Sequence, residues 1–190
     1  MWIKPFNNLL ILCLVAMLLV AIITDLTVRK IPNSLVISGL IVSLVGQCLL
    51  TQGAGGFNWL AGVAVAFACF IPLYLLRGMA AGDVKLMMAV GGFVGYPFVF
   101  TTVGYSYMAG GAIAICYVLF KGRFKQLMQN LYSLIFDQFI KTTSGVDVYD
   151  GKVIKKSVGQ LPFAVAIAVG TFIALYLNTA GNDLIITVKN

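Results

Sequence analysis

The chain has 190 residues, of which 61% are hydrophobic and 10% are charged, and its mean hydropathy is +0.99. Soluble domains are roughly half apolar and about a quarter charged, so this composition excludes an ordinary soluble protein and predicts an all-α membrane helix bundle. The net charge of +7 does not indicate nucleic-acid binding, because the lysines and arginines lie in loops between apolar runs, as membrane topology requires.

The residue types that are missing limit the chemistry further. The sequence has no histidine, which excludes Ser-His-Asp and Cys-His catalysis and histidine-ligated metal sites. All six acidic residues are aspartates, so carboxylate chemistry must use aspartate. The four cysteines lie singly within apolar runs and form no CxxC pair. We therefore expect no zinc site, no redox role, and no metal or cofactor of any kind.

Apolar runs predict about six transmembrane helices within a single domain of residues 1–190. The first run follows Lys4 and is also compatible with a cleaved signal peptide. No small-x-small cleavage site follows it, so we expect a retained helix. Pro32 suits the first turn of the second helix, and Pro72 predicts a kink in the third. The predicted spans are residues 8–24, 34–50, 58–76, 84–94, 100–120 and 160–177.

The connections between the spans are also informative. Gly95-Tyr96-Pro97 predicts a tight turn, and residues after 177 are expected to form a short tail. Small residues four apart, Gly62 with Ala66 and Gly91 with Gly95, predict close packing of helices in the bilayer. The long polar segment of residues 121–158 contains apolar residues at helical spacing, which predicts an interfacial amphipathic helix. These are Phe124, Leu127, Met128, Leu131, Leu134, Ile135 and Phe139.

The positive charges predict the orientation in the membrane. With six spans, the loops at residues 25–33, 77–85 and 121–158 lie on one side and contain eleven of the thirteen Lys and Arg residues. The positive-inside rule places these loops in the cytoplasm and both termini outside. Asp25 and Asp83 then lie at the same membrane depth, near the cytoplasmic face.

Asp25 and Asp83 are the candidate catalytic residues. Each lies at the end of an apolar run, where an ionisable side chain is costly and indicates function. Two carboxylates in a poorly solvated site cannot both ionise freely, so they can share a proton. The ionised one can then activate water while the protonated one polarises a peptide carbonyl. Gly82, beside Asp83, would let a substrate backbone come close and let the loop bend.

Structural roles are the alternative for the same side chains. Asp83 follows a glycine at the start of a predicted helix, which suits an N-cap. Asp25 could pair with Arg29, four residues later. Lys85 suits an interfacial cation that reaches towards water, although it could also influence the charge of Asp83. Solvated surface positions are expected for the other aspartates, Asp137, Asp147, Asp150 and Asp183.

Three stretches carry a resemblance to a known family. Asp25–Asn33 is an aspartate followed by a basic Ile-Pro-Asn turn, Gly82–Leu86 precedes the glycine-rich Gly91–Gly95, and Leu161-Pro162-Phe163 opens the last run. These stretches resemble the two catalytic segments and the last helix of the type IV prepilin peptidases, which are polytopic aspartic proteases of the bacterial inner membrane. The chain resembles the short branch of this family, which serves Flp (tight-adherence) pili.

The resemblance implies a function for the two aspartates. Asp25 and Asp83 would be the catalytic dyad, and the substrate would be a prepilin cut at the cytoplasmic face, just after a glycine that ends a basic leader. Two departures stand out: the family's Gly-x-Gly-Asp is Ala80-Ala81-Gly82-Asp83 here, and Ala164 replaces a frequent glycine. The cysteine-bearing domain of the long members has no counterpart, so the resemblance does not extend to N-methylation of the mature pilin.

Two other functions remain open. A presenilin-like intramembrane protease shares the Gly-Asp motif, but that group pairs it with Tyr-Asp, whereas Thr24 precedes Asp25 here. A small proton- or cation-coupled transporter subunit would also use intramembrane carboxylates. Transporters favour sites near the bilayer midplane and internal repeats, whereas both aspartates here lie near span ends.

Overall fold

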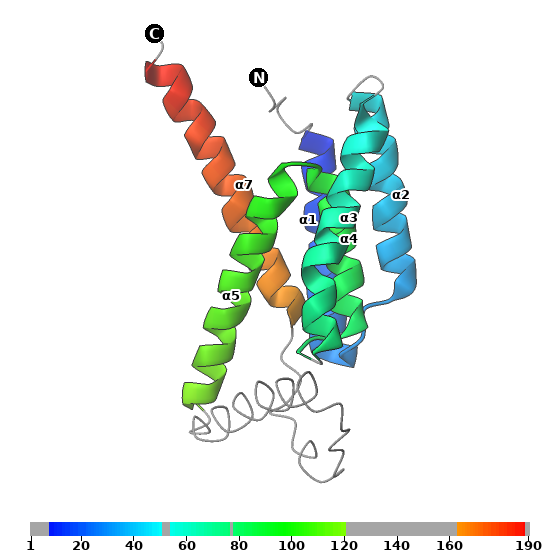
Figure 1. The fold of residues 1–190 in the computed structure, drawn as a ribbon, viewed down its shortest axis with the longest axis vertical. Coiled ribbons are helices and arrows are strands. Elements are labelled where there is room, and N and C mark those ends of the chain that lie inside the picture. The colour runs from blue at the N-terminus through cyan, green and yellow to red at the C-terminus, as the bar shows by residue number, and fades with distance from the viewer. Residues whose placement is uncertain (1–7, 51–53, 77, 121–162, 189–190) are drawn as a thin grey trace, which may run out of the picture. The chain divides into compact units, whose positions relative to one another are not determined.

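The computed structural model describes residues 8–50, 54–76, 78–120 and 163–188, and the secondary structure in these ranges is helical throughout. Figure 1 shows the helices in chain order, and their bounds are α1 Asn8–Val28, α2 Asn33–Leu50, α3 Gly55–Leu75, α4 Ala81–Val94, α5 Phe98–Phe120 and α7 Phe163–Val188. This confirms the predicted all-helical architecture. The predicted amphipathic helix in residues 121–158 lies outside the described residues.

The chain divides into two compact units, one made of residues 1–110 and 162–190 and the other of residues 111–161. The first unit contains α1 to α4, the first half of α5, and α7. Both candidate aspartates, Asp25 and Asp83, belong to this unit.

Three of the described helices are long and apolar enough to cross a membrane, and these candidate spans are residues 9–28, 55–75 and 98–117. Residues 33–49 and 163–178 form shorter apolar helices. The chain is therefore a helical membrane protein. α4 has only 14 residues, which makes it about 21 Å long, shorter than the hydrocarbon core of about 30 Å.

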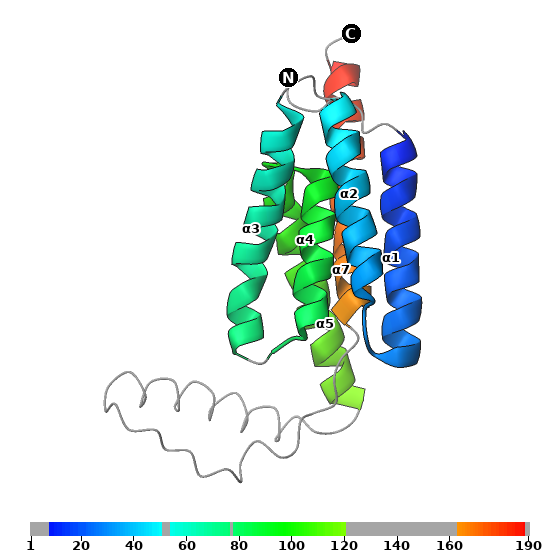
Figure 2. The ribbon, with the colours of Figure 1, turned by 90° about the vertical axis from the view of Figure 1, so that its right-hand side faces the viewer.

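α4 is the central helix of the first unit. It packs against α1, α2, α3 and α7, and Figure 2 shows it between α2 and α3. Ten of its residues are buried, including Asp83 in its first turn. The other polar residues buried in the described part, Ser43, Thr102, Ser106 and Thr171, carry hydroxyl groups. Asp83 is thus held by the most enclosed helix of the unit.

Glycines set the contact between α3 and α4. A Cβ atom at Gly62 would lie 2.3 Å from the carbonyl oxygen of Gly91, and one at Gly91 would lie 2.5 Å from that of Gly62. The predicted small-residue packing is therefore observed between these two helices. Gly95 has a second role: its φ of 68° ends α4 in a conformation that favours glycine.

Two helices extend beyond their predicted ends. α1 continues to Val28 rather than ending at residue 24, because the helix stops only at Arg29, whose φ is 54°. Asp25 consequently lies in the last turn of α1. α7 continues to Val188, so residues after 177 that were expected to be a tail are helical. The tight connection before α5 is confirmed, since α4 ends at Val94 and α5 begins at Phe98.

Candidate active site

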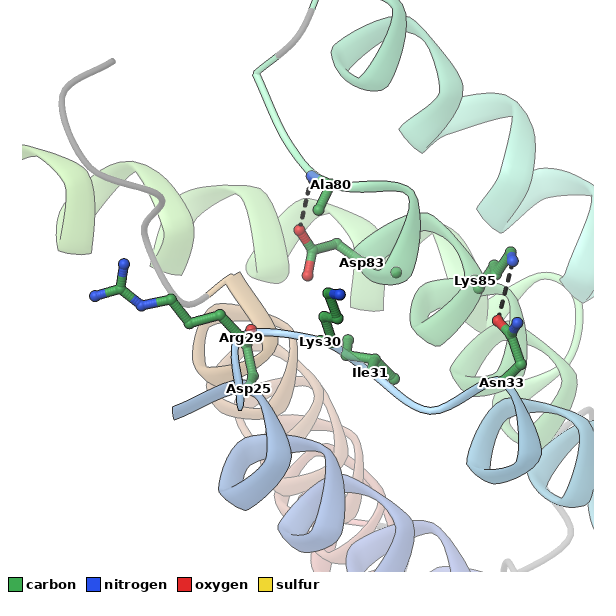
Figure 3. A pocket seen from close by; sticks show the side chains of 9 residues that line it. Asp25, Arg29, Lys30, Ile31, Asn33, Ala80, Asp83 and Lys85 are labelled. Atoms are coloured by element: carbon green, nitrogen blue, oxygen red, sulfur yellow. Dashed lines mark hydrogen bonds between the residues drawn. The ribbon is translucent and has the colours of Figure 1, made fainter. Parts of the chain in front are cut away.

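The end of α1 and the beginning of α4 contribute to one open pocket. Its volume is about 210 Å³. Figure 3 shows Asp25, from α1, and Asp83, from α4, on facing sides of it. The residues that line it are Asp25, Arg29, Lys30, Ile31, Asn33, Ala80, Gly82, Asp83 and Lys85. All four site residues predicted from the sequence, Asp25, Gly82, Asp83 and Lys85, thus lie around the same pocket.

Asp83 is a buried carboxylate that completes the first turn of α4. Its side chain is only 5% exposed. Its Oδ2 accepts a hydrogen bond of 3.1 Å from the Ala80 N–H, and its own N–H donates to the Ala80 carbonyl oxygen at 3.1 Å. Ala80, not Asp83, is the N-cap residue. Asp83 therefore has the expected capping role, but it acts from the third helical position. Its side chain accepts a hydrogen bond from a backbone N–H that has no partner within the helix.

The environment of Asp83 favours its protonated form. The residue precedes residues 84–94, the stretch that was expected to cross the membrane, and it is outside the three long candidate spans. Burial raises the pKa of the Asp83 carboxyl group from its ordinary value of 3.8 to about 6. The Ala80 N–H lowers this pKa, and the negative charge of Asp25 raises it. The negative charge of Asp25 therefore acts on the protonation of Asp83.

Asp25 is held by a helix that begins far away in the sequence. A negative charge in the last turn of α1 opposes the dipole of that helix. Its Oδ2, however, accepts a hydrogen bond of 3.3 Å from the N–H of Ala164, in the first turn of α7. The N-terminal end of a helix favours an anion, so α7 compensates for the unfavourable position in α1.

The expected pairing of Asp25 with Arg29 is observed between backbone atoms rather than between the two charged side chains. The Arg29 N–H donates to the Asp25 carbonyl oxygen at 3.1 Å, which is a backbone contact. Figure 3 shows the Arg29 guanidinium directed away from the Asp25 carboxylate. In the described ranges, the hydrogen bond that holds the Asp25 side chain comes from Ala164.

Gly82 and Lys85 both belong to α4 rather than to a loop. Gly82 is the second residue of the helix, and a Cβ atom there would make only ordinary contacts with the Ile31 side chain, the shortest 3.4 Å. The Lys85 Nζ donates to the Asn33 Oδ1 at 3.1 Å and is exposed, which links α4 to α2. This is compatible with the expected interfacial cation.

The backbone at the first position of the Ala80-Ala81-Gly82-Asp83 motif has no special need for glycine. The backbone of Ala80 is extended, with φ −83° and ψ 154°. This extended conformation is accessible to L-residues without strain. The N–H of Ala80, not its side chain, makes the contact with Asp83. A glycine is therefore not required there to form the hydrogen bond.

Sequence reasoning missed the contact made by Ala164. The hydrogen bond uses a backbone N–H, which every residue except proline carries, so the identity of this side chain contains no signal for it. The predicted helix start near residue 160 indicated that free N–H groups would be present there. No pattern in the sequence indicated which carboxylate would accept one.

The pocket combines the groups that acid–base hydrolysis requires. Asp83 is buried and has a raised pKa, whereas Asp25 is partly exposed. Each carboxylate accepts one backbone hydrogen bond through its Oδ2. Among the described residues, no hydrogen bond is made to the other oxygen of either group. The other oxygen of each carboxylate is thus available to a water molecule or a peptide carbonyl, and the raised pKa of Asp83 lets that carboxyl group keep its proton to a higher pH than an ordinary aspartate.

Comparison with known proteins matches this chain to one protein family. The model of the type IV leader peptidase family matches residues 12–115. This stretch includes every residue that lines the pocket. No curated protein and no solved structure matches the chain. Because the matched stretch covers more than half of the 190 residues and contains both aspartates, we conclude that the chain belongs to the type IV leader peptidase family.

Proposed function

We propose that this membrane peptidase is an aspartic endopeptidase that removes the leader of Flp-type prepilins at the cytoplasmic face of the bacterial inner membrane. Asp25 and Asp83 form its catalytic dyad. The observation that carries the proposal is that these aspartates, distant in the sequence, line one pocket, and that the charge of Asp25 raises the pKa of Asp83. The family match favours a peptidase over the transporter alternative.

The dyad hydrolyses a peptide bond in two steps. One carboxylate takes a proton from water while the water oxygen bonds to the scissile carbonyl carbon, and the other carboxyl group gives its proton to the carbonyl oxygen. The C–N bond of the resulting diol then breaks. The proton taken from water passes to the leaving nitrogen, and a hydroxyl group of the diol returns a proton to the second carboxylate. The products are a carboxylic acid and an amine.

The charges around the pocket limit which part of a prepilin enters it. Arg29, Lys30 and Lys85 line the pocket together with the aspartates. Cations repel one another in a poorly solvated site, so the basic residues of the leader lie outside the pocket. The glycine that ends the leader enters it with the backbone extended, because a helical peptide bond is shielded by its neighbours.

The proposed topology has six spans with both termini outside. The cations Arg29, Lys30 and Lys85 lie together at the end of the unit that carries the pocket, as the positive-inside rule requires for its cytoplasmic end. α4 is short, and protein rather than lipid surrounds it. It therefore brings Asp83 to the pocket from inside the bundle.

The experiment that tests the function is co-expression of the full chain with a Flp-type prepilin in a bacterial host that lacks its own leader peptidase. Mass spectrometry of the pilin should show loss of the leader and a new N-terminus directly after its final glycine. A prepilin with a large residue in place of that glycine should stay uncut. Cleavage in isolated membranes should persist in EDTA. An uncut precursor, with both proteins inserted, would overturn the proposal.

A further inference from the structure

The two aspartates of the pocket have similar hydrogen bonds but different surroundings. Each carboxylate contacts the N-terminal end of a helix and accepts a hydrogen bond from one N–H there, from Ala80 of α4 for Asp83 and from Ala164 of α7 for Asp25. They differ in burial, because Asp83 is 5% exposed while Asp25 is partly open to the pocket. Burial disfavours the charged form of a carboxyl group. When the pair carries one proton, burial therefore favours its location on Asp83.

The N-terminal end of α7 nevertheless supports the charged form of Asp25. Its place in the last turn of α1 opposes the dipole of that helix, and the neighbouring carboxyl group of Asp83 adds repulsion when it ionises. The other charged groups that line the pocket are Arg29, Lys30 and Lys85, and Lys85 is bonded to Asn33. Among the described residues, the direct hydrogen bond that favours the charged form of Asp25 is the one from Ala164.

The N-terminus of α7 is fixed by packing within the core. Phe163 meets Phe70 of α3 edge to face, with ring centroids 6.1 Å apart, and Phe70 stacks on Tyr107 of α5 at 4.9 Å. Ala164 is fully buried. Further along α7, a Cβ atom at Gly170 would lie 2.3 Å from the backbone nitrogen of Ser106. The Ala164 N–H is therefore presented by a helix that has little freedom to move.

We propose that the two aspartates have fixed and different roles, with Asp25 as the base that takes the proton from water and Asp83 as the acid that protonates the carbonyl oxygen. Ala164 is a positioning residue, whose N–H keeps Asp25 ionised and oriented. The inference rests on the proposed function for its chemistry. It adds the assignment of each role and the part played by α7.

Proline scanning of the first turn of α7 tests the positioning role. Ala164→Pro removes the N–H at a place where a helix tolerates proline. Loss of a hydrogen bond to a charged group should lower kcat about tenfold or more, with KM within about twofold. It should also move the acid limb of kcat/KM to higher pH by about one pH unit, because Asp25 then ionises less readily.

Two matched variants serve as controls for that substitution. Val165→Pro places the same ring one residue later in the same turn, and Ala164→Gly keeps the N–H. Both should retain the wild-type kcat within about threefold and the wild-type pH profile, because neither removes the bond to Asp25. If Ala164→Pro matched these controls in kcat and in pH profile, the positioning role of α7 would be wrong.

Infrared titration of the full chain in lipid vesicles tests the charge assignment without a substrate. The band of a protonated carboxyl group should persist to about pH 6 in the wild type and be missing there in Asp83→Asn. In Asp25→Asn the band should remain but vanish at lower pH, because the charge of Asp25 raises the pKa of Asp83.

The opposite pattern, with the band lost in Asp25→Asn and kept in Asp83→Asn, would reverse the two roles and overturn the assignment. Absence of a persistent band in the wild type would overturn it as well. Because the measurement needs no cleavage, these failures are distinct from a wild-type chain that cuts no prepilin, which would overturn the proposed function instead.

Discussion

Replacing Gly62 by alanine is a sharp perturbation of the helix pair that holds Asp83. The new Cβ atom would lie 2.3 Å from the carbonyl oxygen of Gly91 and 3.0 Å from the Cα atom of Gly95. These neighbours are backbone atoms, which cannot rotate away as a side chain does. Carbon–oxygen contacts are ordinarily about 3.3 Å or longer, so α3 and α4 would have to separate by about 1 Å.

The expected cost follows from that displacement. Overpacking of this kind destabilises a protein by about 1–3 kcal/mol. For a chain of this length, this corresponds to a decrease in Tm of about 2–12 °C. The assay is thermal unfolding of the purified chain in detergent, with prepilin cleavage measured in parallel. Cleavage should fall as well, because the helix that must move carries Asp83 in its first turn.

The matched control is Gly104→Ala in α5. It is also a helical glycine, but among the described residues no heavy atom outside its own stretch of helix lies within 4 Å of its Cβ position. Alanine there should leave Tm unchanged or raise it by a few degrees, since glycine in a helix costs about 0.5–1 kcal/mol relative to alanine. If Gly62→Ala were as stable as Gly104→Ala, the close contact between α3 and α4 would be refuted.

Three further predictions concern the pocket. Ala80→Gly should leave kcat/KM within about twofold and lower the free energy of unfolding by about 0.4–1 kcal/mol, since Ala80 has an ordinary extended backbone; a large gain in activity would show that the methyl group hinders catalysis. The kcat/KM of the wild type should decline as pH rises above about 6, because the raised pKa of Asp83 means that its carboxyl group holds the proton below that pH and loses it above; a pH profile that rises steadily from pH 6 to alkaline values would contradict this. Lys85→Met removes the exposed bond to Asn33, which should destabilise the chain by less than about 1 kcal/mol and leave kcat within a few fold; loss of cleavage with normal stability, measured by the same two assays, would give Lys85 a direct role.

The helices could be predicted from the sequence because each of them contains a run of apolar residues. The tight turn at Gly95-Tyr96-Pro97 and the small-residue contact at Gly62 and Gly91 follow from composition and spacing. The ends of α1 and α7 did not follow, because polar residues such as Asn178 lower the hydropathy without ending a helix. A hydropathy pattern reports contact with lipid rather than the last backbone hydrogen bond of a helix.

Only those parts of the site that depend on particular side-chain types could be predicted from the sequence. Asp25 and Asp83 stood out because a carboxylate beside an apolar run is costly, and the pocket includes both. The position of Gly82 inside α4 and the extended backbone of Ala80 depend on where the helix starts, which the motif leaves open. The bond from Ala164 to Asp25 joins residues 139 apart in the sequence, so no local pattern contains it.

Replacing each catalytic candidate by asparagine is the most direct test of the dyad. Asn keeps the shape of the side chain but neither accepts nor delivers the required proton, so Asp25→Asn and Asp83→Asn should each reduce cleavage of a co-expressed prepilin at least about 100-fold. Both variants should insert normally in the membrane. Asp183→Asn, the same substitution near the end of α7, should cleave like the wild type. Normal processing of the prepilin by either Asp25→Asn or Asp83→Asn would contradict the dyad.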